Sequence, residues 1–421
     1  PRSTLFPYTT LFRSGVDPRL PGGALAPGSL LYSQPVTLTG SRRVMARVLH
    51  NAVWSALNEA VFIETTPLPL RITEIMFHPD APPPGSTNTA SDFEFVEIKN
   101  VGLTAFNAAG VRFTSGLSFT FTNKLFAPGE IVVLARHRQA FAERYGTGLA
   151  VLGEFTGTLD NAGERIRLEG PLGEVIQEFR YSDWYPLTDG FGFSLVPVDP
   201  TAGTGSMNDP AWWRASGHPG GSPGADDPTP NLPTVVVNEI LSHTDPPASD
   251  SIELRNLETH AVDLGGWFLS DDLQTPQKYR IPQGTLIGAH GYRVFSEADF
   301  NATPGQGSSF ALSSTGDEIW LFSADAAGQL TGYLHGTRFR AAQNGVSFGR
   351  YLNSVGEEFF PAQSQVTLGT ANAGPRVGPV VINEILYHPA WGQDEYVELK
   401  NIAATNRSEE HTSELQSPNT I

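Results

Sequence analysis

Short stretches in which apolar and polar residues alternate recur along the chain. In "SIELR", Ile252 and Leu254 fall on one side of an extended backbone, while Glu253 falls on the other. This period of two residues predicts an antiparallel strand with one buried and one wet face. A helical period is found only near residues 136–146. Many short strands separated by Gly, Pro and Asp turns predict an all-β protein built from sandwiches.

The alternating stretches belong to a repeat. Three nine-residue segments align without a gap, namely "RITEIMFHP" (71–79), "VVNEILSHT" (236–244) and "VINEILYHP" (381–389). Each opens one copy of the repeat and has a Glu followed four residues later by a His. The six residues are Glu74 and His78, Glu239 and His243, and Glu384 and His388. A second strand follows each opening and carries one further Glu, namely Glu97 in "FVEIKN", Glu253 in "SIELRN" and Glu398 in "YVELKN". Repeats of this kind predict successive copies of one structural unit.

The first two copies stay similar further along. "LDNAGERIRL" (159–168) matches "LSSTGDEIWL" (312–321), and "GFGF" (190–193) matches "GVSF" (345–348). Glu239 lies 165 residues after Glu74, whereas only 37 residues follow Glu384. We therefore expect the third copy to be cut off after its second strand.

Both ends differ from the repeat. "RSEEHTSELQS" (407–417) and "PRSTLFPYTTLFRS" (1–14) resemble translated sequencing adapters. We therefore expect residues 1–14 and 407–421 to be artefacts that pack against nothing, so that 15–406 is an internal fragment.

Composition excludes several classes of function. The net charge of −17 disfavours a nucleic-acid partner, because phosphates repel an acidic surface. The chain has no cysteine, which excludes thiolate catalysis and disulfides. No apolar run approaches the length of a membrane span, so none is predicted.

The segment "VNEIL…DSIELRNLETHAVDLGGWFLSD" (237–271) resembles bacterial lamin tail domains. This resemblance implies tandem immunoglobulin-like β-sandwiches at 70–228 and 234–375, with a truncated third at 380–406. The first copy departs from it, since Val111 stands where Trp267 does. Upstream, residues 15–65 resemble the last strands of a chitobiase-type C-terminal or fibronectin-associated module. Proline-rich stretches at 63–69 and 226–233 are interpreted as linkers.

The repeated carboxylates and imidazoles are the candidate binding residues. Two carboxylates and a His could bind a divalent cation, and oxygen-rich sites suit calcium. The alternative is a structural network on the wet strand face, where Glu97, Glu253 and Glu398 each have a cation two residues on. Such surface pairs contribute only about 0.2–1 kcal/mol. Glu239 shares its strand face with Val237 and Leu241, which predicts partial burial. The structural interpretation is favoured over calcium, and no metal or cofactor is assigned.

Two G-x-S-x-G matches contain Ser222 and Ser347. That motif needs a strand-to-helix turn in an α/β sheet, so neither serine is predicted to be a nucleophile. Exposed aromatic residues could instead stack on a sugar. Trp267 is interpreted as a core residue, while for Trp212 and Trp213 both core packing and sugar stacking remain open.

The resemblance implies a function without catalysis. We expect structural, adhesion or binding modules of a large exported bacterial protein, located outside the cell or on its surface. The partner would be a cell-surface polysaccharide or a protein. The alternative is that these domains are accessories of an exported hydrolase or kinase-like enzyme whose catalytic domain lies outside this fragment.

Overall fold

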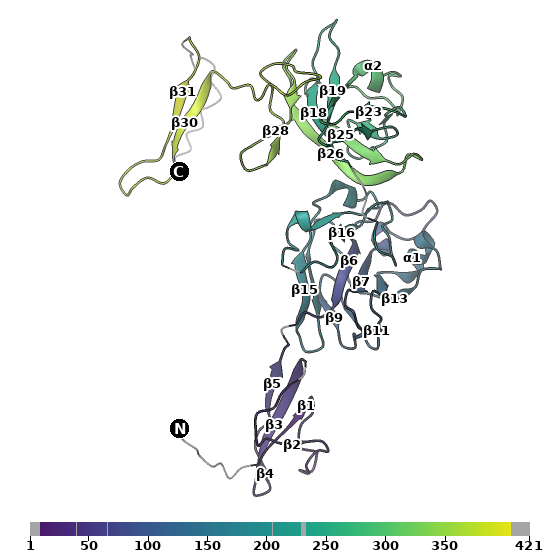
Figure 1. Ribbon diagram of the computed structural model, residues 1–421, viewed down its shortest axis with the longest axis vertical. Helices are drawn as coiled ribbons and strands as arrows, with labels where there is room; N and C mark the ends of the chain where they lie inside the picture. Colours follow the sequence, from purple (N-terminus) through teal and green to yellow (C-terminus); the bar gives the residue numbers. More distant parts are fainter. Residues whose placement is uncertain (1–8, 39, 65, 204, 229–232, 406–421) are drawn as a thin grey trace. The chain divides into compact units, whose positions relative to one another are not determined.

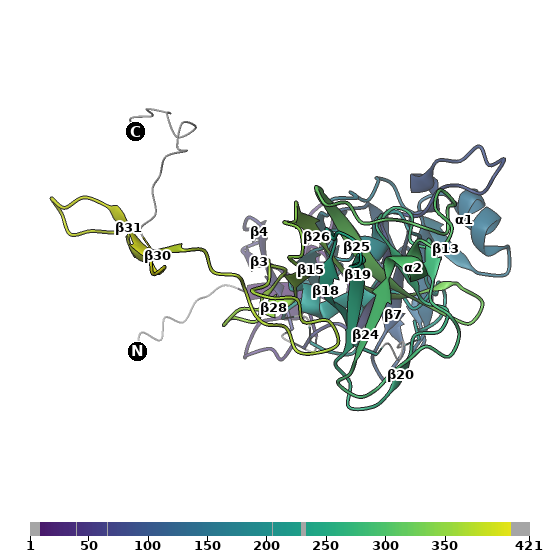
Figure 2. The same ribbon diagram turned by 90° about the horizontal axis from the view of Figure 1, so that it is seen from above.

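The all-β prediction is confirmed. The computed structural model describes residues 9–38, 40–64, 66–203, 205–228 and 233–405. The chain divides into two compact units, residues 1–231 with 330–332 and residues 232–329 with 333–421 (Figures 1 and 2). Within the described residues the helical elements are short: α1 (Arg138–Tyr145), α2 (Glu297–Phe300), η1 (Ala90–Phe93), η2 (Pro186–Thr188) and η3 (Pro210–Trp212). None of these helices is long and apolar enough to cross a membrane.

An antiparallel sheet lies near the N-terminus. Its strands are β1 (Thr9–Ser14), β2 (Leu30–Leu31), β3 (Arg42–His50), β4 (Val53–Trp54) and β5 (Asn58–Phe62). The order is β2-β1-β3-β4, with β5 also paired to β3. The expectation that residues 1–14 contact nothing is wrong for β1, whose backbone pairs with β3 from Thr9 to Ser14. Residues 1–8 and 407–421 lie outside the described residues, and the adapter origin of both ends stays a prediction.

The first sandwich consists of two main sheets. The larger has the order β13-β12-β7-β6-β16-β17 and the smaller β10-β9-β14-β15. Their strands are β6 (Leu70–Met76), β7 (Phe95–Asn100), β9 (Arg112–Ser115), β10 (Phe119–Thr120), β12 (Ile131–Ala135), β13 (Val151–Glu154), β14 (Arg165–Glu169), β15 (Val175–Arg180), β16 (Leu195–Pro197) and β17 (Trp213–Ala215). A separate pair joins β8 (Phe106–Asn107) to β11 (Leu125–Phe126).

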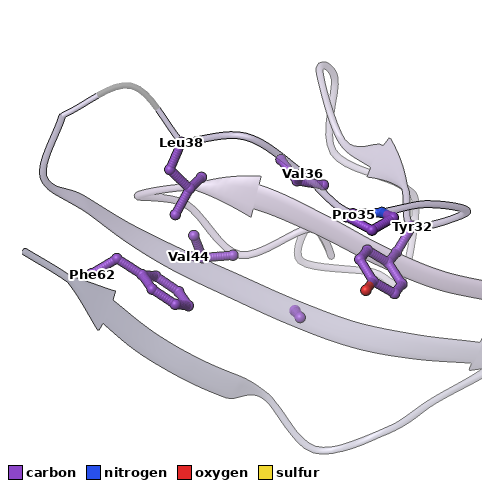
Figure 3. Close-up of a pocket in the computed structure, with 7 residues that line it drawn as sticks. Tyr32, Pro35, Val36, Leu38, Val44 and Phe62 are labelled. Carbon is purple, nitrogen blue, oxygen red and sulfur yellow. The ribbon is translucent and has the colours of Figure 1, made fainter.

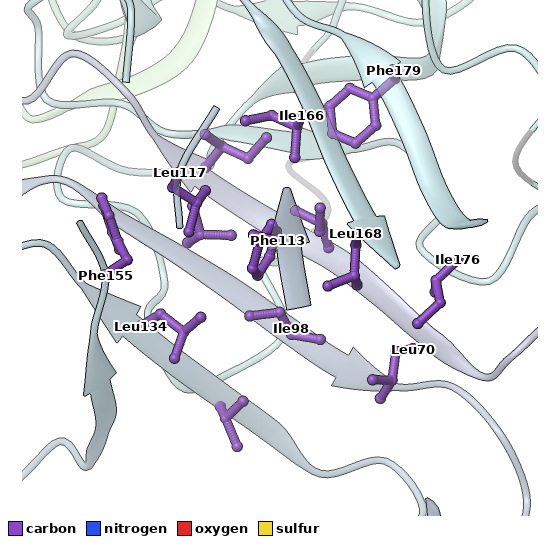
Figure 4. Close-up of a cluster of buried hydrophobic side chains, with 14 of the residues drawn as sticks. Leu70, Ile98, Phe113, Leu117, Leu134, Phe155, Ile166, Leu168, Ile176 and Phe179 are labelled. Carbon is purple, nitrogen blue, oxygen red and sulfur yellow. The ribbon is translucent and has the colours of Figure 1, made fainter. Parts of the chain in front are cut away.

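The core of this sandwich fills the space between its sheets. Ile98 and Leu134 of the larger sheet belong to the same buried cluster as Phe113 and Leu168 of the smaller one (Figure 4). The helix predicted near 136–146 is confirmed as α1. It covers part of the outer face of the larger sheet, where Phe141 meets Phe95 edge-on at 5.7 Å between ring centroids. This sheet is therefore buried on both faces along part of its length.

The second sandwich repeats the arrangement. Its sheets have the orders β24-β19-β18-β27 and β22-β21-β25-β26, and β20 pairs with β23. The strands are β18 (Val235–Leu241), β19 (Ser251–Asn256), β20 (Val262–Asp263), β21 (Phe268–Ser270), β22 (Tyr279–Arg280), β23 (Leu286–Ile287), β24 (Tyr292–Ser296), β25 (Gly316–Ala324), β26 (Leu330–Arg340) and β27 (Phe348–Gly349). Trp267 is 6% exposed and joins this core, as interpreted from the sequence. Trp213 is likewise buried in the first core, and Trp212 packs against that core while half-buried.

Two hairpins come after β27 in the chain. The first pairs β28 (Tyr351–Leu352) with β29 (Glu358–Phe359). The other pairs β30 (Val380–Leu386) with β31 (Tyr396–Asn401). Because it carries the third copy of the repeat, we call it the third hairpin.

Candidate functional site

A β-bulge decides where the repeated Glu residues point. Glu74 lies directly opposite Glu97 in the β6–β7 pair, and the register shifts between Ile72 and Glu74. The extra residue, Thr73, reverses the alternation, so that Ile72 and Ile75 both enter the core. Glu74 therefore points to the outer face of the sheet, on the same face as Glu97.

The second sandwich has the same bulge. Glu239 lies opposite Glu253, with the register shift between Val237 and Glu239. Val237 packs in the core, whereas Glu239 points to the outer face of the sheet. The prediction that Glu239 and Val237 share a strand face is therefore wrong, because simple alternation ignores the extra residue of the bulge. We call Glu74 with Glu97, and Glu239 with Glu253, the carboxylate pairs.

Both carboxylate pairs are fully buried. Glu74 and Glu97 are each 1% exposed, and Glu239 and Glu253 are each 0% exposed. The predicted wet strand face is thus wrong at these positions. The predicted pairing with Lys99 is not seen either, since its Nζ lies 2.5 Å from Asp226 Oδ1.

A segment near the end of the first sandwich covers its carboxylate pair. The backbone N–H groups of Ser222 and Gly224 donate to Glu74 Oε1 at 2.9 Å and to Glu97 Oε2 at 2.8 Å. The Ser194 hydroxyl also donates to Glu74 Oε1, at 2.5 Å. Thr73, the bulge residue, donates to Glu97 Oε1 at 2.6 Å. No donor among the described residues reaches the buried Glu74 Oε2.

The second sandwich uses an equivalent segment. Thr367 donates twice to Glu239, from its backbone N–H to Oε1 at 2.9 Å and from its hydroxyl to Oε2 at 2.7 Å. The Ser347 hydroxyl donates to Glu239 Oε1 at 2.5 Å, and the Gly369 N–H donates to Glu253 Oε2. Residues 222–227 and 367–372 therefore play the same role, and we call them the clasp segments.

The fifth position after the Ser or Thr completes each clasp segment. Asn372 donates to the Asn238 carbonyl at 3.1 Å and accepts from the Asn238 amide at 2.7 Å, while that amide also donates to Glu253 at 2.6 Å. In the first sandwich the corresponding residue is Asp227, which accepts from the Ser222 hydroxyl at 2.8 Å and pairs with Arg214 at 2.6 Å.

Burial raises the pKa of the paired carboxyls, because the charged form loses its hydration. The pKa of Glu74 rises to about 8, chiefly through burial and then through the adjacent Glu97. The pKa values of Glu97 and Glu253 each rise to about 7, again through burial. Glu94, which the sequence did not single out, has its pKa raised to about 7 by burial although the Leu159 N–H donates to it at 2.9 Å.

The histidines do not join the carboxylate pairs. His78 Nδ1 lies 2.5 Å from Asp189, and His243 Nδ1 donates to the Ala342 carbonyl at 2.8 Å. His388 is exposed. Among the described residues, no group of three or more His, Asp and Glu side chains is arranged to hold a metal ion. The structure thus assembles the predicted Glu residues in pairs and sends the His residues elsewhere.

Ser222 and Ser347 act as hydrogen-bond donors to carboxylates, as described above. The structure also corrects the alignment of "GFGF" with "GVSF". Leu195 pairs with Ile75, as Phe348 pairs with Ile240, so Ser194 is equivalent to Ser347. The sequence signal for the clasp segments was the shared Ser/Thr-x-Gly triplet, which was not recognised because backbone N–H donors leave no side-chain signature.

The third hairpin reproduces the bulge, and no clasp segment covers it among residues 9–405 that the structure describes. Glu384 lies opposite Glu398 in the same shifted register. Both are exposed, in contrast to the other two pairs. Asn383 donates to Glu398 Oε1, as Asn238 does to Glu253, and the Tyr396 hydroxyl donates to Glu384 Oε1 at 2.7 Å.

One hollow lies away from these contacts, and one cavity lies beside them. An apolar hollow of about 500 Å³ in the N-terminal sheet is lined by Tyr32, Pro35, Val36, Leu38, Val44, Ala46 and Phe62 (Figure 3). A polar cavity of about 300 Å³ adjoins Glu97. Its cations, Lys99 and Arg214, are already paired with Asp226 and Asp227.

Comparison with known proteins agrees with the fold of the second sandwich. No curated protein matches the chain, and no solved structure does. The sequence model of one family matches residues 228–335, and this segment is therefore similar to the Lamin Tail Domain, an immunoglobulin-like module.

Proposed function

We propose that the two sandwiches are non-catalytic structural modules of a large exported bacterial protein, acting as spacers in adhesion at the cell surface. The similarity of residues 228–335 to an immunoglobulin-like domain supports a structural or binding module. The partner at the cell surface would be a polysaccharide or a protein.

One observation carries the proposal. In each sandwich the clasp segment, near its end, is hydrogen-bonded to the first strand of that sandwich. Glu239 lies on β18, and the donors to it from Thr367 come 128 residues later. In the first sandwich, 148 residues separate Glu74 from its donor Ser222.

This link matters for a spacer because tension enters a tethered domain through its ends. Hydrogen bonds between the first strand and the last segment carry that tension directly, before the core strands are loaded. The carboxyl oxygens accept these hydrogen bonds in a buried place, where a hydrogen bond is stronger than it is in water. A domain closed in this way resists extension at both of its ends.

The carboxylates themselves favour this structural interpretation over catalysis. Each of the four buried carboxyls accepts hydrogen bonds from its own sandwich. A general acid or base needs access to a substrate proton. At 1% exposure or less, these groups contact protein rather than solvent.

Single-molecule extension of the full chain tests the proposal. Handles at both ends would measure the unfolding force of the second sandwich in the wild type and in Glu239→Ala. The matched control is Ile252→Ala, a core truncation that costs about 2–5 kcal/mol without touching the clasp segment.

We expect Glu239→Ala to lower the unfolding force more than Ile252→Ala does, for an equal loss of equilibrium stability. An equal drop in force for the two variants would overturn the proposed role of the clasp segment in resisting tension.

A further inference from the structure

The third hairpin exposes the faces that the other copies bury. Ile382 and Leu399 are 60% and 57% exposed, whereas their equivalents Val237 and Leu254 are both 0% exposed. Its outer face presents Glu384 and Glu398. In both sandwiches a clasp segment covers the equivalent face. The clasp segments therefore indicate what kind of partner would fit the outer face of the third hairpin.

Three polar residues of the outer face match between the third hairpin and the second sandwich, although Tyr396 replaces Ser251. Asn383, Glu384 and Glu398 occupy the positions of Asn238, Glu239 and Glu253, in the same register. Asn383 also holds Glu398 as Asn238 holds Glu253. The acceptor is therefore preorganised, and binding would need little rearrangement on this side.

In the second sandwich the bulge residue contacts the clasp segment directly. Asn238 makes two hydrogen bonds with Asn372. Its side-chain amide donates to Asn372, and its backbone carbonyl accepts from Asn372. Where the bulge residue is Thr73, the clasp segment instead ends in Asp227, which binds Arg214. Because the third hairpin carries Asn383, it fits a segment that ends in Asn.

We propose that the outer face of the third hairpin is a docking site for an extended peptide segment of the pattern Ser/Thr-x-Gly-x-x-Asn. The Ser or Thr donates its backbone N–H and hydroxyl to Glu384. The Gly donates its N–H to Glu398, and the Asn pairs with Asn383. The Tyr396 hydroxyl already occupies one oxygen of Glu384, so the incoming donors use the other oxygen or displace it.

Gly at the third position of the pattern has a physical reason. Gly224 and Gly369 both have a φ near +85° to +90°, a conformation that strains residues with a Cβ. Each presents its N–H to the second carboxylate of its pair. The docking segment therefore needs Gly there for its backbone shape.

The experiment uses the full chain and a fluorescein-labelled peptide with the sequence of residues 363–374, followed by fluorescence anisotropy. We expect saturable binding. A peptide with glycolic acid in place of Gly369, whose ester oxygen replaces the N–H without adding bulk, should bind about tenfold or more weakly, since one hydrogen bond to a carboxylate is lost. An Asn372→Asp peptide should also bind about tenfold more weakly, because a carboxylate cannot donate to the Asn383 carbonyl and repels the Glu pair.

The protein variant is Glu384→Ala combined with Glu398→Ala. Both residues are exposed, so the folded sandwiches should be unaffected, and binding should be lost. Binding retained in this variant would mean that the peptide displaces a clasp segment of a sandwich, and it would overturn the proposal. So would the absence of saturable binding up to about 2 mM peptide. A self-associating chain whose dimer buries this face, shown by sedimentation and by loss of association in the same variant, would overturn it in favour of a second copy.

Discussion

The two sandwiches bury the same carboxylate pair but satisfy it unequally. In the second, both oxygens of Glu239 accept hydrogen bonds, two of them from Thr367. In the first, Glu74 Oε1 takes two donors while Oε2 is buried without one among the described residues. The Ser222 hydroxyl, the counterpart of the Thr367 hydroxyl, donates to Asp227 instead.

The difference shows that hydrogen-bond supply, more than burial, separates the two sites. Both first-strand carboxyls are almost inaccessible to solvent. Yet the first lacks one donor, because Asp227 draws the Ser222 hydroxyl away while it pairs with Arg214. A buried oxygen without a donor favours the protonated form of the carboxyl group. The first sandwich should therefore gain more stability at low pH than the second.

The largest expected effect comes from removing a well-satisfied carboxylate. Glu239→Ala should lower the free energy of unfolding of the second sandwich by about 3–5 kcal/mol, because it leaves Ser347 and Thr367 donors buried without an acceptor. The same change at the exposed Glu384 should stay within about 0.5 kcal/mol. Thermal unfolding of both variants checks this, and similar melting temperatures for the two would contradict the structural role of the pair.

A change of pH should separate the two sandwiches next. A carboxyl whose pKa rises on folding stabilises the native state below its unfolded pKa, and this stabilisation is lost as pH rises through the folded pKa. The unfolded value is 4.5, and the folded values are about 8 for Glu74 and about 7 for Glu97 and Glu94. In the second sandwich Glu253 rises to about 7.

Stability should therefore fall between about pH 4.5 and 8 in both sandwiches, and more steeply in the first. We expect the first to lose more stability than the second over this window, because three carboxyls with pKa values raised to about 7 or 8 lie in the first. Hydrogen exchange measured by mass spectrometry in β7 and β19, corrected for the intrinsic pH dependence, would report each opening free energy. Parallel pH profiles would show that the missing donor has no energetic consequence.

The smallest expected effect is that the same Glu→Gln change alters the stability of the two sandwiches in opposite directions. At pH 9, Glu74→Gln should stabilise the first sandwich by about 1–2 kcal/mol, since it removes a buried charge at an oxygen without a donor. Glu239→Gln should destabilise the second by about 1 kcal/mol, because an amide nitrogen cannot accept the Thr367 hydroxyl bond. Chemical denaturation of each variant tests this, and a shift in the same direction for both would refute the unequal supply of donors.

Much of the fold could be predicted from local patterns. Alternation located the strand pairs, and the helical period at 136–146 located α1. The two Glu residues of each copy were grouped in one candidate site, and they lie opposite each other because they are on adjacent strands of one hairpin. The predicted wet face failed because alternation gives the two faces of a strand but not what covers each face.

The sequence by itself determined the hairpin. The third copy forms the same bulge and register as the other two, and Asn401 closes its turn on Thr405 at 2.9 Å, as Asn256 does on His260 at 2.8 Å. These features depend on residues close together in the chain, whose interactions cost little loop entropy.

Only the tertiary structure decided what the carboxylates become. Glu239 and Glu384 stand in nearly identical sequences, yet one is buried and the other exposed. The difference comes from donors far along the chain, the Ser347 hydroxyl 108 residues away and two groups of Thr367 128 residues away. One of the Thr367 donors is a backbone N–H, which has no identity in sequence. Because any residue except proline offers that N–H, its partner is set by where the chain folds back.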